Sequence, residues 1–144
     1  MWVGTFWGVF VRRCKFWFLL PLLGATFASA ENSPWVDIFE THDHSKFHIK
    51  RGSVKVVNGY KDMMFVEAVV RITFSDLNSP IVLQKWRVSK AHCKAQMGKV
   101  YVTRIDGTTT GELEFVFDGG NAASAVAQVL CMIGEADAAS TRKH

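Results

Sequence analysis

Residues 63–75 read Met-Met-Phe-Val-Glu-Ala-Val-Val-Arg-Ile-Thr-Phe-Ser, and their alternating pattern decides the fold class. Every even-numbered position from Met64 to Phe74 is apolar, whereas the odd-numbered positions include the charged residues Glu67 and Arg71. Successive side chains of a strand point to opposite faces of the sheet. This period of two therefore predicts a long strand with one core face and one mixed face.

Shorter runs of strand-like sequence lie on both sides of this segment. They are residues 35–40, 46–50, 53–57, 81–92, 99–105 and 112–117. Polar or glycine-containing turns such as Asn58-Gly59 and Asp106-Gly107 separate them. No helical period appears between Trp35 and Phe117. Strands joined by short turns form antiparallel sheets, so we expect an antiparallel sheet of about six strands.

The period changes after Gly119-Gly120-Asn121, where Asn121 is a candidate helix N-cap. Residues 122–133 carry apolar side chains on one helical stripe, and Gly134 stands where a C-terminal stop belongs. Residues 135–144 show no pattern and predict a disordered tail. The expected fold is α+β: one domain over residues 31–134, with a C-terminal helix packed on the sheet.

The first thirty residues have the features of a secretory signal peptide. Arg12, Arg13 and Lys15 precede an apolar run over residues 16–27, which closes on Ala28-Ser29-Ala30. A basic segment, an apolar core of about a dozen residues and a small-x-small site are typical of an exported protein. We expect cleavage after Ala30 and no stable membrane span afterwards, because this core is short for a bilayer of about 30 Å. An uncleaved N-terminal anchor is the alternative.

Removal of this segment changes the charge balance of the chain. The full chain of 144 residues has a formal net charge of +4. Residues 31–144 keep 14 basic and 13 acidic side chains, a net charge of +1. A near-neutral domain gives little support to nucleic-acid binding, so we expect no nucleic-acid partner.

Two cysteines, Cys93 and Cys131, remain in the expected mature chain. An even pair in an exported protein predicts a disulfide. The pattern places Cys93 at the end of the strand over residues 81–92 and Cys131 in the last turn of the helix. The bond would close a loop of about 39 residues, which contributes about 4 kcal/mol in the chain-entropy model.

Histidines gather in one short segment, with His42 and His44 beside Asp43 and His48 a few residues later. Such a set could bind Zn, Cu or Ni. Asp, His and Ser are also common at polar turns for conformational reasons, and we expect a turn here rather than a metal site or cofactor. Ser89, His92 and Asp106 lack the glycines of a nucleophile elbow, so we expect no enzyme activity.

The second long strand has a basic character with one large aromatic side chain. Lys85, Trp86, Arg87 and Lys90 form a candidate binding surface, because Trp and Arg are favoured anchors of protein interfaces. The alternative is a solvated strand face with Trp86 in the core. The pattern alone leaves both interpretations open.

The order of these features resembles the surface-adhesin E family of bacterial envelope proteins. The resemblance spans about Trp35 to Cys131 and rests most on residues 87–93 (RVSKAHC) and 118–131 (DGGNAASAVAQVLC). It implies a six-stranded antiparallel sheet with a disulfide-tied helix on its concave face. It also implies an adhesive role toward host matrix or plasma proteins. The family's best-known member is lipid-anchored, whereas Cys14 of this chain precedes the apolar core, so no lipidated cysteine is expected.

These observations predict an exported, non-enzymatic, adhesin-like binding protein in the periplasm, at the cell surface or secreted from a bacterium. Its expected partners are extracellular matrix or plasma proteins, contacted through the sheet surface and loops. A periplasmic structural or envelope-assembly protein without a host ligand is the first alternative. A small metal-binding protein or hydrolase is the second. The oligomeric state stays open.

Overall fold

The computed structural model of the chain describes residues 33–141. They belong to one compact unit, Glu31–His144, and the core residues found among them lie between Ile49 and Cys131. This unit therefore carries its own hydrophobic core, as an independently folding domain does. The predicted signal peptide, residues 1–30, lies outside the described residues.

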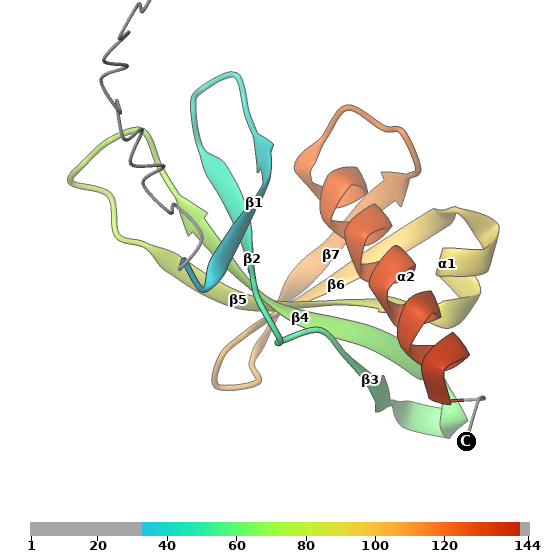
Figure 1. The fold of residues 1–144 in the computed structure, drawn as a ribbon. Helices are drawn as coiled ribbons and strands as arrows, with labels where there is room; N and C mark the ends of the chain where they lie inside the picture. The colour runs from blue at the N-terminus through green and yellow to red at the C-terminus, as the bar shows by residue number, and fades with distance from the viewer. Residues whose placement is uncertain (1–32, 142–144) are drawn as a thin grey trace, which may run out of the picture. The chain divides into compact units, whose positions relative to one another are not determined.

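Residues 33–141 form an antiparallel sheet of seven strands and a long C-terminal helix, so the α+β prediction is confirmed (Figure 1). All six strand pairings are antiparallel. The elements are β1 (Trp35–Glu40), β2 (Lys46–Lys50), β3 (Lys55–Asn58), the 3₁₀ turn η2 (Tyr60–Asp62), β4 (Met64–Thr73), β5 (Val82–Ser89), α1 (Lys90–Ala95), β6 (Met97–Arg104), β7 (Thr109–Val116) and α2 (Ala122–Thr141).

The strand count exceeds the predicted six because β2 and β3 share one position in the sheet. The strand order is β1-β2-β4-β5-β6-β7, and β3 also pairs with β4. β2 pairs with the second half of β4, and β3 pairs with its first half. A turn containing Gly52, whose φ is 71°, separates the two short strands. The sheet is therefore six positions wide although seven strands build it.

The predicted two-faced strand is β4, at the centre of the sheet. Its even-numbered side chains from Val66 to Ile72 are all buried, whereas Glu67 and Arg71 on the other face are half-buried. α2 lies across the face that carries the even-numbered residues (Figure 1). This face is called the inner face below, and the opposite one the outer face.

α2 begins where the sequence indicates. The Asn121 side chain accepts a hydrogen bond from the backbone N–H of Ser124 at 2.8 Å, so the predicted N-cap is confirmed. Val126, Ala127 and Leu130 are fully buried against the sheet. By length and composition alone the stretch Ala122–Ser140 could also cross a membrane. In this fold it is the core helix of the described domain.

The predicted end of α2 and the predicted disordered tail are wrong. The helix continues through Gly134 to Thr141, and the last three residues of the predicted tail, 142–144, lie outside the described part. Gly134 is buried, and a Cβ on it would lie 2.5 Å from Val66 Cγ2. This glycine therefore permits close packing of the helix on β4 rather than ending the helix. The alanines and Glu135 that follow are good helix formers.

A short helix replaces the predicted end of the second long strand. β5 stops at Ser89, whose hydroxyl accepts a hydrogen bond from the backbone N–H of His92 at 3.1 Å and so caps α1. Gln96 then ends α1 in a left-handed conformation with φ at 57°. Cys93 therefore lies in α1 and not in the strand. Six residues are too few to produce a visible helical period.

Candidate binding surface

The four residues of the predicted binding surface do not share one surface. Trp86 belongs to the inner face, where only 2% of it is exposed, and its Nε1 donates to Gln84 Oε1 at 2.9 Å. Lys85 and Arg87, its neighbours in β5, point to the outer face. Lys90 lies in α1. The interpretation of Trp86 as a core residue is therefore correct, and Trp86 is removed from the candidate surface.

The strand register shows which residues accompany Lys85 and Arg87 on the outer face. In β4, Val69 lies opposite Lys85, and Glu67 lies opposite Arg87. One strand further, His48 lies opposite Arg71, and Lys50 lies beside Trp35 of β1. Neighbouring strands are about 4.8 Å apart, so these side chains form one continuous patch across four strands.

Two arginines of this patch are held over aromatic rings. The guanidinium carbon of Arg71 lies 4.6 Å from the ring centroid of Trp35, and that of Arg87 lies 5.2 Å from the ring of Phe65. Phe65 is buried and packs edge-on against Tyr101 at 5.8 Å. Cation–π contacts of this kind orient the planar guanidinium and restrict its motion.

The same two arginines have unsatisfied hydrogen-bonding groups. The Nε atoms of Arg71 and Arg87 are buried and have no hydrogen-bond partner among the described residues. Buried polar atoms are nearly always paired, so an orphaned one requires an explanation. Because both Nε atoms are buried, a ligand at the outer face could supply an acceptor to them only if the arginine side chains moved.

Other cations on or beside the outer face are neutralised by carboxylates. Lys46 pairs with Glu40 at 3.6 Å, Lys55 with Glu67 at 3.8 Å and Lys99 with Glu112 at 2.6 Å. The hydrogen bond to Glu112 also raises the pKa of Lys99. No ion pair within the described residues involves Lys50, Arg71, Lys85 or Arg87. With Trp35, these four cations are named the outer-face cluster.

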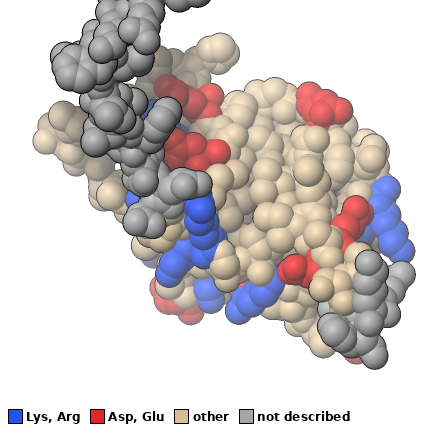
Figure 2. Space-filling view, in the orientation of Figure 1, with Lys and Arg blue, Asp and Glu red and all other residues tan. Residues whose placement is uncertain are grey.

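The side of the molecule that carries α2 has a different character. Figure 2 shows this side in the orientation of Figure 1, and its centre is a broad uncharged area with lysines and arginines only toward the margins. An apolar groove of about 460 Å³ also lies on the inner face, with Trp86 and Phe47 in its lining. The outer-face cluster is therefore a local concentration of charge on a domain whose expected net charge is only +1.

The histidines of the predicted turn are not brought together. His42 is exposed, and His44 binds Glu40 at 2.8 Å, which lowers the pKa of Glu40. His48 is 5% exposed and belongs to β2, which confirms the predicted strand over residues 46–50. Within residues 33–141, no three His, Cys, Asp or Glu side chains stand close enough together to hold a metal ion.

His48 instead bridges three strands on the outer face. Its Nδ1 donates to Asp37 Oδ1 at 2.5 Å, and its Nε2 shares a hydrogen bond with the Thr73 hydroxyl at 3.1 Å. Both ring nitrogens of a buried imidazole are therefore satisfied. Sequence reasoning missed this trio because its members come from β1, β2 and β4. Only the strand register brings them together.

Hydrogen bonds among its own side chains account for the polar residues of the turn between β1 and β2. The Thr41 hydroxyl donates to the Asp43 carboxylate, and the Ser45 hydroxyl donates to the same group at 3.2 Å. These hydrogen bonds, that of Thr41 foremost, lower the pKa of Asp43. Asp and Thr stabilise turns in this way without any ligand.

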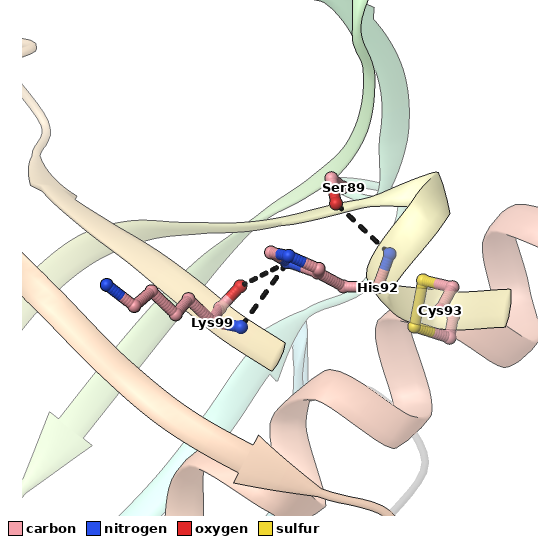
Figure 3. The surroundings of a disulfide bond; sticks show 5 residues. Ser89, His92, Cys93 and Lys99 are labelled. Carbon is pink, nitrogen blue, oxygen red and sulfur yellow. Dashed lines mark hydrogen bonds between the residues drawn. A yellow bond between two sulfur atoms is a disulfide. The ribbon is translucent and has the colours of Figure 1, made fainter. Parts of the chain in front are cut away.

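The predicted pairing of Cys93 with Cys131 is confirmed, with an S–S distance of 2.06 Å and a Cα–Cα distance of 5.4 Å (Figure 3). The bond joins α1 to the middle of α2. Nearby, the His92 ring accepts a hydrogen bond from the Lys99 backbone N–H at 3.3 Å and stacks on Tyr101. Ser89 caps α1, and Asp106 accepts from the Thr108 N–H in another turn. These residues form no catalytic triad.

Comparison with known proteins leaves the family of this chain unassigned. No family model, curated protein or solved structure matches it. The resemblance to the surface-adhesin E family therefore stays a prediction that rests on the residues quoted for it.

Proposed function

We propose that this chain is an exported, non-enzymatic binding module that engages an acidic surface of a protein partner through the outer-face cluster. The single observation that carries the proposal is the pair of arginines at this face. Arg71 and Arg87 are stacked on aromatic rings, lack ion-pair partners among the described residues and have orphaned Nε groups. Their guanidinium groups are ordered in advance, so a partner carboxylate can bind with little loss of side-chain entropy.

The type of surface favours a protein partner. Trp and Arg are enriched among the residues that dominate the energy of protein interfaces. The cluster spreads over β1, β2, β4 and β5 as a patch and lies outside the clefts described for this domain. A patch suits a protein surface better than it suits a small molecule, which requires a concave site.

Export and an adhesin-like role complete the proposal. The basic and apolar N-terminal sequence supports export, and the Cys93–Cys131 disulfide fits an oxidising compartment such as the periplasm or the cell exterior. The resemblance to the surface-adhesin E family supports extracellular matrix or plasma proteins as the partners.

The test uses purified residues 31–144 and immobilised matrix and plasma proteins. We expect saturable binding that weakens as salt rises, because exposed charges are screened. The double variant Lys50→Glu/Lys85→Glu should reduce the affinity at least about tenfold, which corresponds to about 1.4 kcal/mol. The matched control is Lys90→Glu/Lys94→Glu, which makes the same change in net charge on α1.

Two results would contradict the proposal. One is the absence of saturable binding to any acidic matrix or plasma protein. The other is equal loss in the two double variants, which would show a general effect of net charge. Both variants should keep the melting temperature of the parent to within a few degrees, so that lost binding is not lost folding.

The first alternative is a periplasmic structural or envelope-assembly component without a host ligand. Cell fractionation separates the two functions. Surface exposure together with binding of intact cells to matrix proteins supports the adhesin-like role. Retention in the periplasm, with capture of an envelope protein by cross-linking, supports the alternative.

The Asp37–His48–Thr73 trio is the observation that favours the second alternative, a hydrolase. Its carboxylate–imidazole–hydroxyl order is that of a catalytic triad. The Thr73 oxygen would bond to the ester carbonyl carbon while its proton passes to His48 Nε2. The ester C–O bond then breaks, His48 returns the proton to the departing oxygen, and water hydrolyses the acyl-threonine. The check is turnover of p-nitrophenyl acetate by residues 31–144. Turnover above the buffer rate that is lost in Thr73→Val would establish hydrolysis. Equal rates in both proteins would assign the trio a structural role.

A further inference from the structure

A cleft of about 390 Å³ opens beside the disulfide. It lies between α1, the second half of α2 and the start of β4, away from the outer-face cluster. Ligand sites of proteins have volumes of about 300 to 1,000 Å³, so this cleft can hold a small molecule. It exists because α2 continues beyond Gly134, and the part of the helix after this residue forms one wall of the cleft.

The base and the far wall of the cleft are apolar. The Cys93–Cys131 bond and Val66 lie at its base, and all three residues are buried. Ala138 and Ala139 line the wall formed by α2. Small side chains on α2 leave the space open, and the close approach of Gly134 to Val66 holds that helix in place. An acyl chain could therefore lie along this wall and exclude water from it.

Charged groups line the rest of the cleft. Lys90 and Lys94 stand one helical turn apart in α1, so their ammonium groups share one side of the opening. Glu135 of α2 is the third charged residue of the lining, which leaves a net charge of +1. No ion pair within the described residues involves Lys90, Lys94 or Glu135. Two ammonium groups that have no ion-pair partner in the described part of the chain, beside an apolar wall, match a ligand with an anionic head and one hydrocarbon chain.

We propose that this cleft binds a medium-chain fatty acid, with its carboxylate between Lys90 and Lys94 and its chain against Ala138, Ala139 and the disulfide. The proposal does not depend on the proposed function, because the two sites use different residues on different elements. The same chemistry could come from a free fatty acid or from a single-chain lipid with an anionic head group. An exported domain can meet both.

The test uses laurate, labelled with ¹³C at the carboxyl carbon, and residues 31–144. Binding is followed by the carboxyl chemical shift below the concentration at which laurate forms micelles. We expect one saturable site per domain. Lys90→Glu/Lys94→Glu should weaken binding at least about tenfold, and Lys50→Glu/Lys85→Glu, with the same charge change on the outer face, should leave it unchanged.

A second pair of variants tests the chain site. Ala138→Phe should block the cleft and abolish saturable binding. Ala136→Phe places the same side chain at an exposed position of α2 that does not line the cleft, and it should have no effect. If Ala138→Phe lowers the melting temperature, the lysine variants still decide the outcome. Dodecyltrimethylammonium, a cation with a chain of the same length, should bind at least tenfold more weakly than laurate.

Several outcomes would overturn this inference. They are absence of saturable binding below the micelle concentration, equal binding by the two double lysine variants, or equal affinity for laurate and the ammonium surfactant. Binding to phosphatidylglycerol vesicles without binding to laurate would show that α1 recognises a membrane surface and not a chain. Each double variant tests one site and serves as the control for the other. Lys50→Glu/Lys85→Glu tests the outer-face cluster, and Lys90→Glu/Lys94→Glu tests the cleft. One of the two proposals can therefore be refuted while the other stands.

Discussion

Replacing Cys93 and Cys131 together by alanine removes the covalent link between α1 and α2. The two cysteines are 38 residues apart in the chain, and in the chain-entropy model a closed loop of that length contributes about 4 kcal/mol. Both side chains are buried, so the lost sulfur packing adds to this value. Domains of this size are stabilised by about 5–15 kcal/mol in total, so the variant should lose a large fraction of its stability.

Urea denaturation of residues 31–144 measures this loss, with amide hydrogen exchange to locate it. The first half of α2 is held by the fully buried Val126, Ala127 and Leu130, which the variant keeps. Exchange should therefore accelerate first in α1 and in α2 beyond Cys131, while β4 and β5 stay protected. An unfolding free energy within about 1 kcal/mol of the parent would refute the reasoning, and so would two free thiols in the denatured, unreduced parent.

Three further predictions use matched controls or a direct mass measurement. His48→Ala should destabilise the domain by about 1–3 kcal/mol in urea denaturation, because Asp37 and Thr73 lose a buried partner, whereas the exposed His44→Ala should change stability by no more than about 0.5 kcal/mol. Gly134→Ala should destabilise by about 1–3 kcal/mol through its clash with Val66, and Gly120→Ala, whose Cβ meets no described atom within 4 Å, should not; a neutral Gly134→Ala would show that the packing of α2 on Val66 does not require a glycine. Mass spectrometry of the exported protein should show a chain that begins at Glu31, and a chain that begins at Met1 would support the uncleaved anchor.

Sequence periodicity predicted the parts of this fold that are long and two-faced. The alternation of apolar residues in β4 and the apolar stripe of α2 show which side chains are buried. This follows because side chains return to the same face at a fixed spacing along a strand or a helix. α1 was missed since one and a half turns cannot establish a period, even though Ser89 is a good N-cap. Gly134 was misread because a glycine can end a helix or permit close packing, and only the position of Val66 distinguishes the two roles.

The candidate surface was harder to predict than the fold. Lys85 and Arg87 were identified correctly from the sequence of one strand. Side chains alternate between the two faces of a strand, so Trp86, which lies between them, points to the opposite face. Lys90 belongs to another element, α1. The aromatic ring that accompanies Arg71 is Trp35, which is 36 residues earlier in the chain. Such partners depend on the register between β1, β2 and β4, which short-range sequence patterns do not specify.

NMR of the arginine Nε–H groups shows whether the outer-face cluster is the binding surface of this domain. The sample is ¹⁵N-labelled residues 31–144, titrated with the matrix or plasma protein that residues 31–144 bind most tightly. Because the guanidinium groups of Arg71 and Arg87 lie in the outer-face cluster, a partner carboxylate bound there should shift their Nε–H resonances by the largest amounts. Arg104, in β6, should shift little. Unchanged Arg71 and Arg87 resonances at saturation, with shifts confined to α2 and the inner face, would show that the partner binds elsewhere on the domain.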